Sequence, residues 1–242
     1  MCGRYAVTLP PEAMRDLFRT LNQLDYPPRY NIAPTQPIPV VWQQAGRRTA
    51  QLVRWGLIPA WVRDPREFSL VINARAESME DKPAFRDALR NQRCIVPASG
   101  YFEWHTRPDG TKQPYYVTMA DGSPMAFAGL YSTWSGPHGE EIDTAAIVTT
   151  PAGPDTSHIH PRTPAVLRGD AVEQWLDTAR IPARVAAQLA QPLETGTVTL
   201  FPVCRGVGSA DKDGPELIQP VAPEAAPPRR KAAGGGSQLD LF

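Results

Sequence analysis

Two apolar runs lie close together in the stretch CIVPASGYFEW, residues 94–104 of the 242-residue chain. The first is Cys94-Ile95-Val96-Pro97 and the second is Tyr101-Phe102-Glu103-Trp104. Each run has the length and the β-branched or aromatic composition of a strand, and small residues separate the two. The stretch therefore predicts two strands in succession, with one carboxylate placed beside apolar neighbours.

Further strands are predicted on both sides of this stretch. Residues 38–43 and 48–54 form a predicted hairpin around a turn at Ala45-Gly46. Val71-Ile72 is expected to end a strand just before the polar Asn73-Ala74-Arg75. The other predicted strands are residues 115–118, 125–131 and 144–150, with a Pro-Asp-Gly turn at 108–110.

Only short helices are predicted. Met14, Leu17, Phe18 and Leu21 have helical spacing within residues 12–21. The other predicted helices are Lys82 to Arg90, residues 171–179 with Asp170 as N-cap, and residues 182–190. Because strands outnumber helices and do not alternate with them, we expect an α+β fold with a mixed or antiparallel, barrel-like sheet and short peripheral helices.

Composition favours one large domain and excludes several classes of protein. Hydrophobic residues make up 42% of the chain, which is enough for a packed core, and no apolar run is long enough to cross a bilayer. The formal net charge is zero, but residues 1–107 hold 15 Lys+Arg against 10 Asp+Glu, a local excess of five positive charges. Three cysteines without an export signal argue against a disulfide framework. We expect a cytoplasmic monomer without a metal or cofactor.

Cys2 can undergo a reaction that an internal cysteine cannot. Removal of Met1 before this small residue is expected, and it would leave an α-amine and a thiol on adjacent carbons. The α-amine has an ordinary pKa of about 7.7–8.0, against about 10.4 for lysine, so more of it is the neutral nucleophile near pH 7. The amine can condense with an aldehyde to an imine, and the thiol can then close a five-membered thiazolidine ring.

Several blocks of sequence together resemble the SOS-response-associated peptidase (SRAP) family. The resemblance covers about residues 2–219, which would form one catalytic domain. The blocks, in order, are CGRY at 2–5, NIAPT at 31–35, WGLIPAW at 55–61, NARAE at 73–77, VPASGYFEW at 96–104 and HIHPRTP at 158–164. Thr163 stands where the family usually has Met, and Pro161 where it usually has a polar residue.

The resemblance implies a reaction with damaged DNA. In that family the N-terminal cysteine forms a thiazolidine with the ring-opened deoxyribose of an abasic site in single-stranded DNA, which shields the lesion during replication and the SOS response. The implied catalytic residues are Cys2, Asn73 to hold the N-terminus and the sugar, Glu103 as acid and base, and His160 to assist proton transfer. The implied DNA contacts are Arg4, Arg75, Arg162, Trp104, Trp55 and Trp61.

Two other classes of function remain open. An N-terminal-nucleophile amidohydrolase or peptidase would use the Cys2 thiol for acyl transfer, with the α-amine as base. Self-removal of Met1 is compatible with this reaction and with the crosslinking reaction alike. A non-enzymatic adapter would bind DNA and a second protein without forming a covalent bond.

The end of the chain predicts a tethered binding peptide. Residues 220–237 are rich in Pro, Ala and Gly and read as a disordered linker. The last five residues, 238–242, resemble the peptide that binds the bacterial β sliding clamp. Leu239, Leu241 and Phe242 would fill a hydrophobic cleft, Gln238 would bond at its edge, and Asp240 lies between them. This resemblance predicts the clamp as a partner at the replication fork within the nucleoid.

Overall fold

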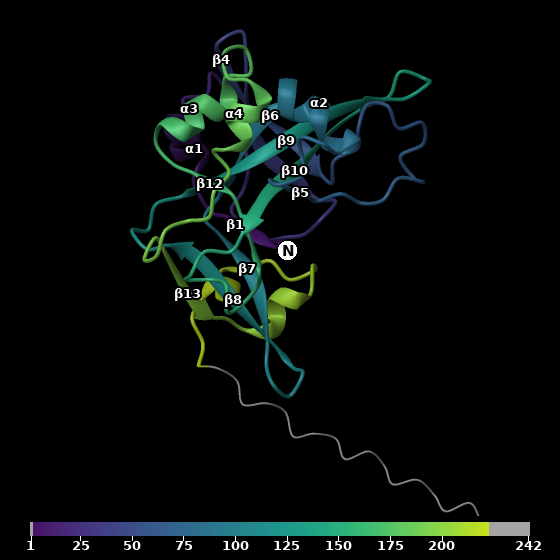
Figure 1. Ribbon diagram of the computed structural model, residues 1–242. Coiled ribbons are helices and arrows are strands. Elements are labelled where there is room, and N and C mark those ends of the chain that lie inside the picture. Colours follow the sequence, from purple (N-terminus) through teal and green to yellow (C-terminus); the bar gives the residue numbers. More distant parts are fainter. Residues whose placement is uncertain (1, 223–242) are drawn as a thin grey trace, which may run out of the picture.

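The computed structural model of the chain describes residues 2–222 (Figure 1). Residue 1 and residues 223–242, which hold most of the predicted linker and all of the predicted clamp-binding peptide, lie outside the described residues.

Five strands close into a barrel in the order β10-β4-β3-β6-β9, and pairing of β9 with β10 completes the ring. The β10–β4 pair is parallel and the other pairs of the ring are antiparallel, so the sheet is mixed. The barrel strands are β3 (Pro37–Gln44), β4 (Arg47–Trp55), β6 (Arg93–Ala98), β9 (Met125–Ser135) and β10 (Glu141–Pro151). Three short strands extend this sheet: β5 (Asn73–Arg75), β11 (Arg162–Pro164) and β12 (Val166–Leu167).

A second sheet of five antiparallel strands lies against the barrel, in the order β13-β8-β7-β1-β2. Its strands are β1 (Tyr5–Val7), β2 (Arg29–Ile32), β7 (Gly100–Thr106), β8 (Lys112–Met119) and β13 (Val198–Pro202). In Figure 1, β1 lies where the two sheets meet, with the long barrel strands β9 and β10 above it and β7 and β8 below it. Residues near the start of the chain therefore lie at the junction of the sheets.

The stretch 93–106 links the two sheets. β6 belongs to the barrel and β7 to the second sheet, and only Ser99 separates them. Gly100 follows this switch, and a Cβ there would lie 2.5 Å from both Tyr116 Cζ and the Val117 carbonyl oxygen. Because β-carbons do not approach other atoms so closely, glycine lets β7 pack directly on β8.

The helices are short and lie mostly around the barrel end of the molecule (Figure 1). They are α1 (Pro11–Phe18), α2 (Pro83–Asn91), α3 (Asp170–Leu176), α4 (Ala183–Ala187) and the 3-10 turns η1 (Arg205–Gly208) and η2 (Pro215–Ile218). Among residues 2–222, every helix is too short or too polar to cross a bilayer. The predicted α+β class with a barrel-like mixed sheet is confirmed.

Three local predictions need correction. The strand near Asn73 begins at Asn73 and does not include Val71-Ile72, because Asn73–Arg75 pair in parallel with Ile147–Thr149 of β10. Asp170 is the first helical residue of α3 and not its cap; Gly169 occupies the N-cap position with φ of 52°, and the helix ends at Leu176. Helix α1 ends at Phe18, because Arg19 takes the left-handed conformation.

Candidate active site

Cys2 lies fully buried at the junction of the sheets, just before β1. Asn73, the first residue of β5, donates a hydrogen bond from Nδ2 to the Cys2 carbonyl oxygen at 3.0 Å. The Oδ1 atom of Asn73 is also buried and has no hydrogen-bond partner within the described part of the chain. Asn73 therefore fixes the backbone of Cys2 and keeps one acceptor available beside it.

Glu103 comes from the centre of β7 and is 95% buried, with only 5% of its surface exposed. Burial raises the pKa of its carboxyl group to about 7. Burial and the charge of Glu103 together raise the pKa of the Cys2 thiol. The two groups are thus electrostatically coupled, and burial lets the Glu103 carboxyl group hold a proton at a higher pH than an exposed glutamate does.

His160 lies next to Glu103, with 3.9 Å between His160 Nδ1 and Glu103 Oε1. The same ring nitrogen lies 3.1 Å from both the backbone nitrogen and the carbonyl oxygen of Arg162. Unprotonated Nδ1 can accept from the Arg162 N–H, and protonated Nδ1 can donate to the Arg162 carbonyl. Burial lowers the pKa of His160, so the neutral ring predominates at neutral pH.

Arg162 begins β11, which pairs with the end of β10. Its guanidinium forms a bidentate ion pair with Glu77, with distances of 2.7 Å from NH1 to Oε1 and 3.1 Å from NH2 to Oε2. NH2 also donates to the Thr149 carbonyl oxygen at 2.6 Å. The sequence placed Glu77 in a motif but gave it no role, because nothing in the motif indicates that its carboxylate meets an arginine 85 positions later.

Arg4 is tied to the second sheet and to η1. Its NH1 donates to Asn31 Oδ1 at 3.2 Å and its NH2 donates to the Gly208 carbonyl oxygen at 3.2 Å. Asn31 is fully buried and donates in turn to the carbonyl oxygens of Ser209 and Lys212, each at 2.8 Å. The sequence does not indicate this role for Asn31, since its partners lie 178 and 181 residues away along the chain.

The tryptophans named as DNA contacts differ in their exposure. Trp55 is completely buried, stacks edge-on against Tyr5 at 5.3 Å and donates to the Ile72 carbonyl oxygen at 3.0 Å. The predicted contact between Trp55 and DNA is therefore contradicted, because the ring of Trp55 is fully packed in the core. Trp61 is 57% exposed, and Trp104 is half-buried against the cluster around Phe102. Arg75 is exposed at the end of β5.

The two departures from the family pattern lie beside His160. Thr163 is buried, and its hydroxyl lies 2.7 Å from the Tyr101 hydroxyl, so a polar contact forms there. The Pro161 carbonyl oxygen accepts from the Ala152 backbone at 3.0 Å, which ties the loop to the residue that directly follows β10. Both residues thus fix the loop that carries His160.

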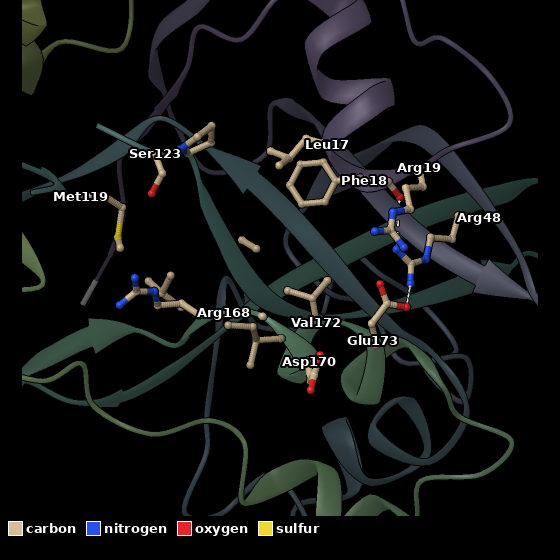
Figure 2. A pocket seen from close by; sticks show the side chains of 15 residues that line it. Leu17, Phe18, Arg19, Arg48, Met119, Ser123, Arg168, Asp170, Val172 and Glu173 are labelled. Atoms are coloured by element: carbon tan, nitrogen blue, oxygen red, sulfur yellow. Dashed lines mark hydrogen bonds and ion pairs between the residues drawn. The ribbon is translucent and has the colours of Figure 1, made fainter. Parts of the chain in front are cut away.

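Other features of the described residues do not compete with this site. Within residues 2–222, no three His, Cys, Asp or Glu side chains come together as metal ligands. A cavity of about 490 Å³ lies between the end of α1 and the start of α3, where Figure 2 shows Arg48 directed at Glu173 near Phe18. None of the candidate catalytic residues lines this cavity, so its size alone does not identify the reactive site.

The structure brings together Cys2, Asn73, Glu103, His160 and Arg162. Together they offer a buried sulfur, a carboxyl group with a pKa near neutrality, an imidazole and a guanidinium. These groups can move protons at a carbonyl carbon while an anion is held nearby.

Comparison with known proteins identifies the family of this chain. Residues 1–210 match the family model described as SOS response associated peptidase (SRAP). The chain is 33% identical over 222 residues to "Abasic site processing protein YoqW" of Bacillus subtilis (strain 168), covering 90% of this chain and 99% of that protein. It is 32% identical over 229 residues to "Abasic site processing protein YedK" of Escherichia coli (strain K12), covering 91% and 100%.

Two further proteins resemble this chain over most of its length. The chain is 31% identical over 285 residues to "Abasic site processing protein HMCES" of Gallus gallus, covering 100% of this chain and 83% of that protein. A crystal structure of a protein from Bacteroides thetaiotaomicron superposes with a TM-score of 0.82 at 26% identity, covering 91% of this chain and all of that one. On these matches and this architecture, the chain belongs to the SOS response associated peptidase (SRAP) family.

Proposed function

We propose that this protein processes abasic sites by forming a thiazolidine crosslink between Cys2 and the ring-opened deoxyribose in single-stranded DNA. The observation that carries the proposal is the placement of Cys2 beside Asn73 and next to a buried carboxyl group whose pKa is about 7. Relatives that match nearly the whole chain are named abasic site processing proteins. The crosslink would shield the lesion during replication.

The proposed chemistry proceeds in two bond-forming steps. The free α-amine of Cys2 attacks the aldehyde carbon of the open sugar, and the resulting hydroxyl leaves as water to give an imine. The thiol sulfur then bonds to the imine carbon, and the thiol proton passes to the nitrogen. One water is released overall, and no oxidant or reductant is needed.

Each proposed catalytic role matches an available proton or hydrogen bond. The protonated fraction of Glu103 donates to the sugar ring oxygen while the anomeric hydroxyl gives up its proton to water, which opens the ring and exposes the aldehyde. As the amine then loses its two N–H protons, Glu103 regains one of them and donates it to the leaving hydroxyl. His160, with its Nδ1 atom 3.9 Å from Glu103 Oε1, assists the transfer of protons and the reversal of the crosslink. Asn73 holds the Cys2 carbonyl through Nδ2, and its Oδ1 is free to accept from the amine or from a sugar hydroxyl.

The proposed DNA contacts are three arginines and two tryptophans. Arg4, Arg75 and Arg162 would bind phosphates, because guanidinium groups match phosphate oxygens in charge and geometry. Trp104 and Trp61 would stack on bases next to the lesion.

The state of the thiol argues against the peptidase alternative. A cysteine that attacks peptide bonds needs a thiolate, and such sites lower the pKa of the thiol. Here burial and the negative charge of Glu103 raise it. A neutral thiol suits late addition to an imine, because the amine makes the first bond.

Incubation with single-stranded DNA that carries one abasic site tests the proposal. Wild-type protein should give an adduct that survives denaturing electrophoresis, with an intact mass equal to protein without Met1 plus DNA minus one water. Cys2→Ser should give none, while Cys204→Ser, which alters another free cysteine, should react like wild type. An adduct that persists in Cys2→Ser, or one that forms equally well on undamaged DNA, would contradict the mechanism.

We further propose that residues 238–242 bind the β sliding clamp and thereby bring the monomeric protein to replication forks. The linker would raise the local concentration of the domain near newly copied DNA. In a pull-down with purified clamp, deletion of residues 238–242 should abolish binding and leave crosslinking intact. Clamp capture by the truncated protein would refute this assignment, and replacement of residues 232–237 by an equal length of Gly and Ser serves as the matched control.

A further inference from the structure

Arg162 is already paired before any DNA is present. Glu77 holds its guanidinium through two hydrogen bonds of 2.7 and 3.1 Å, and Thr149 holds NH2 from the other side through its carbonyl oxygen and its hydroxyl. The side chain of Arg162 is mostly buried, and that of Glu77 is about half exposed. The positive charge of Arg162 is therefore largely neutralised on its solvent side.

The carboxylate of Glu77 remains charged across the neutral range. Burial by itself would raise its pKa, but the hydrogen bonds from Arg162 and the nearby positive charges outweigh burial, so the net shift is downward. A phosphate that approaches Arg162 must consequently compete with an ionised carboxylate for the same N–H groups.

The surroundings of Glu77 allow its carboxylate to move aside. Glu77 borders a hollow of about 440 Å³, which also contains Arg184 on its wall. Thr149 contacts Arg162 from a separate direction and would still hold NH2 after Glu77 departs. The Nε atom of Arg162 is buried and has no hydrogen-bond partner among residues 2–222, so the guanidinium retains unused donor capacity.

We propose that Glu77 is a positioning residue that orients Arg162 in the empty site and yields it to a DNA phosphate when the strand binds. The inference rests on the proposed function, because it assumes that Arg162 faces the DNA backbone. The exchange would also add specificity, because only a ligand with a phosphate positioned at Arg162 compensates for the loss of the Arg162–Glu77 ion pair.

Equilibrium binding at several salt concentrations tests this exchange. The ligand is a single-stranded oligonucleotide with a tetrahydrofuran abasic analogue, which binds but cannot form an aldehyde. Glu77→Gln keeps the size of the side chain and removes its charge, so affinity at low salt should rise about two- to fivefold, the range of a partly exposed ion pair. The slope of log affinity against log salt should steepen by up to about 0.7, the value for one phosphate contact on a single strand.

Two further variants separate exchange at Arg162 from a general charge effect. Glu80→Gln removes an exposed carboxylate three residues away on the same hollow and should leave the slope unchanged. In an Arg162→Gln background, Glu77→Gln should no longer raise affinity. Weaker binding by Glu77→Gln, an unchanged slope, or a gain that persists without Arg162 would overturn the proposal.

Crosslinking to a true abasic site is measured in parallel with wild-type protein. If wild type forms no adduct, the proposed function fails whatever the salt slopes show. If wild type forms the adduct and Glu77→Gln leaves the slope unchanged, only the exchange at Glu77 fails.

Discussion

At the scale of single residues, the site depends on a carboxyl group held in an environment that disfavours its charge. Glu103 is almost completely buried in β7, and burial brings the pKa of its carboxyl group to about 7. An exposed glutamate would be ionised at pH 7 and unable to donate a proton. The buried position of Glu103 in the sheet, more than its residue type, allows it to donate a proton near neutral pH.

The pH dependence of crosslinking should reflect Glu103 directly. The protonated form donates, so its contribution falls as the pH rises above about 7. The α-amine acts in its neutral form, and its contribution rises up to about pH 8. We expect a rate maximum between about pH 7 and 8, and in Glu103→Gln a rate lowered by about 100-fold without the alkaline decline. Single-turnover rates from pH 5.5 to 9 provide the measurement, and an alkaline decline retained by the variant would assign it to another group.

The contact between Tyr101 and Thr163 should contribute to stability. Their hydroxyls lie 2.7 Å apart in the core beside the His160 loop. Thr163→Val keeps the shape and removes one partner, which should lower the free energy of unfolding by about 1 kcal/mol. The double variant with Tyr101→Phe should lose less than the sum of the single changes. Urea unfolding measures all four proteins, and strict additivity would mean that the two hydroxyls do not interact.

At the scale of elements, the molecule depends on the close packing of β7 on β8 after the chain leaves the barrel. Ser99 alone separates β6 from β7, and its hydroxyl lies 2.8 Å from that of Thr8 while also accepting from the Thr8 backbone. The absence of a side chain at Gly100 permits the approach of Tyr116.

Gly100→Ala should therefore destabilise the domain by about 1–3 kcal/mol, as expected when an atom is forced into a packed core. The added Cβ would lie 2.5 Å from the ring of Tyr116 and from the Val117 carbonyl oxygen. Gly208→Ala is the matched control, because a Cβ there meets nothing within 4 Å and no left-handed backbone is involved. Chemical denaturation compares the two, and equal stability of both variants would show that β7 can shift without cost.

The elements that the sequence predicts are those with local signals. The Ala45-Gly46 turn between apolar runs predicts the hairpin of β3 and β4, and in the structure both turn residues have positive φ, at 48° and 74°. Strands β1, β2, β11 and β12 contain two to four residues each and gave no periodic pattern. They exist because distant partners pair with them, so only the folded chain reveals them.

The residues of the candidate site likewise divide into those with a local sequence signal and those that depend on distant contacts. Cys2, Asn73, Glu103 and His160 could be named because they carry chemistry and fall within recognisable motifs, and the structure places them together. The sequence does not reveal the roles of three other residues, because these roles are hydrogen bonds and an ion pair with side chains or backbone groups elsewhere along the chain. They are Asn31, Glu77 and Thr149. Trp55 was misassigned because a tryptophan in a motif looks the same whether its ring faces solvent or the core.

At the scale of the whole molecule, β10 organises both the barrel and the site. It pairs with β9 and β4 inside the ring and with β5 and β11 at its far end. Asn73 lies opposite Ile147 and Arg162 opposite Pro151, so both sides of the site are positioned by one strand.

Backbone amides of residues 144–150 should consequently be among the slowest to exchange with solvent. Their strand is paired on both edges, and opening it requires disruption of the closed barrel. Hydrogen exchange followed by mass spectrometry should place this peptide near the limit set by global unfolding, while the exposed turn at residues 108–110 exchanges early. Rapid exchange of 144–150 in the native state would show that the barrel opens locally at the site.

The sharing of β10 limits how the chain length can change. A single residue added to or removed from Ile147–Pro151 would turn the following side chains to the opposite face of the sheet. Asn73 and Arg162 would then be out of step with each other, although neither had been altered. The number of residues in this short segment is therefore fixed by the need to keep Asn73 and Arg162 in register on either side of it.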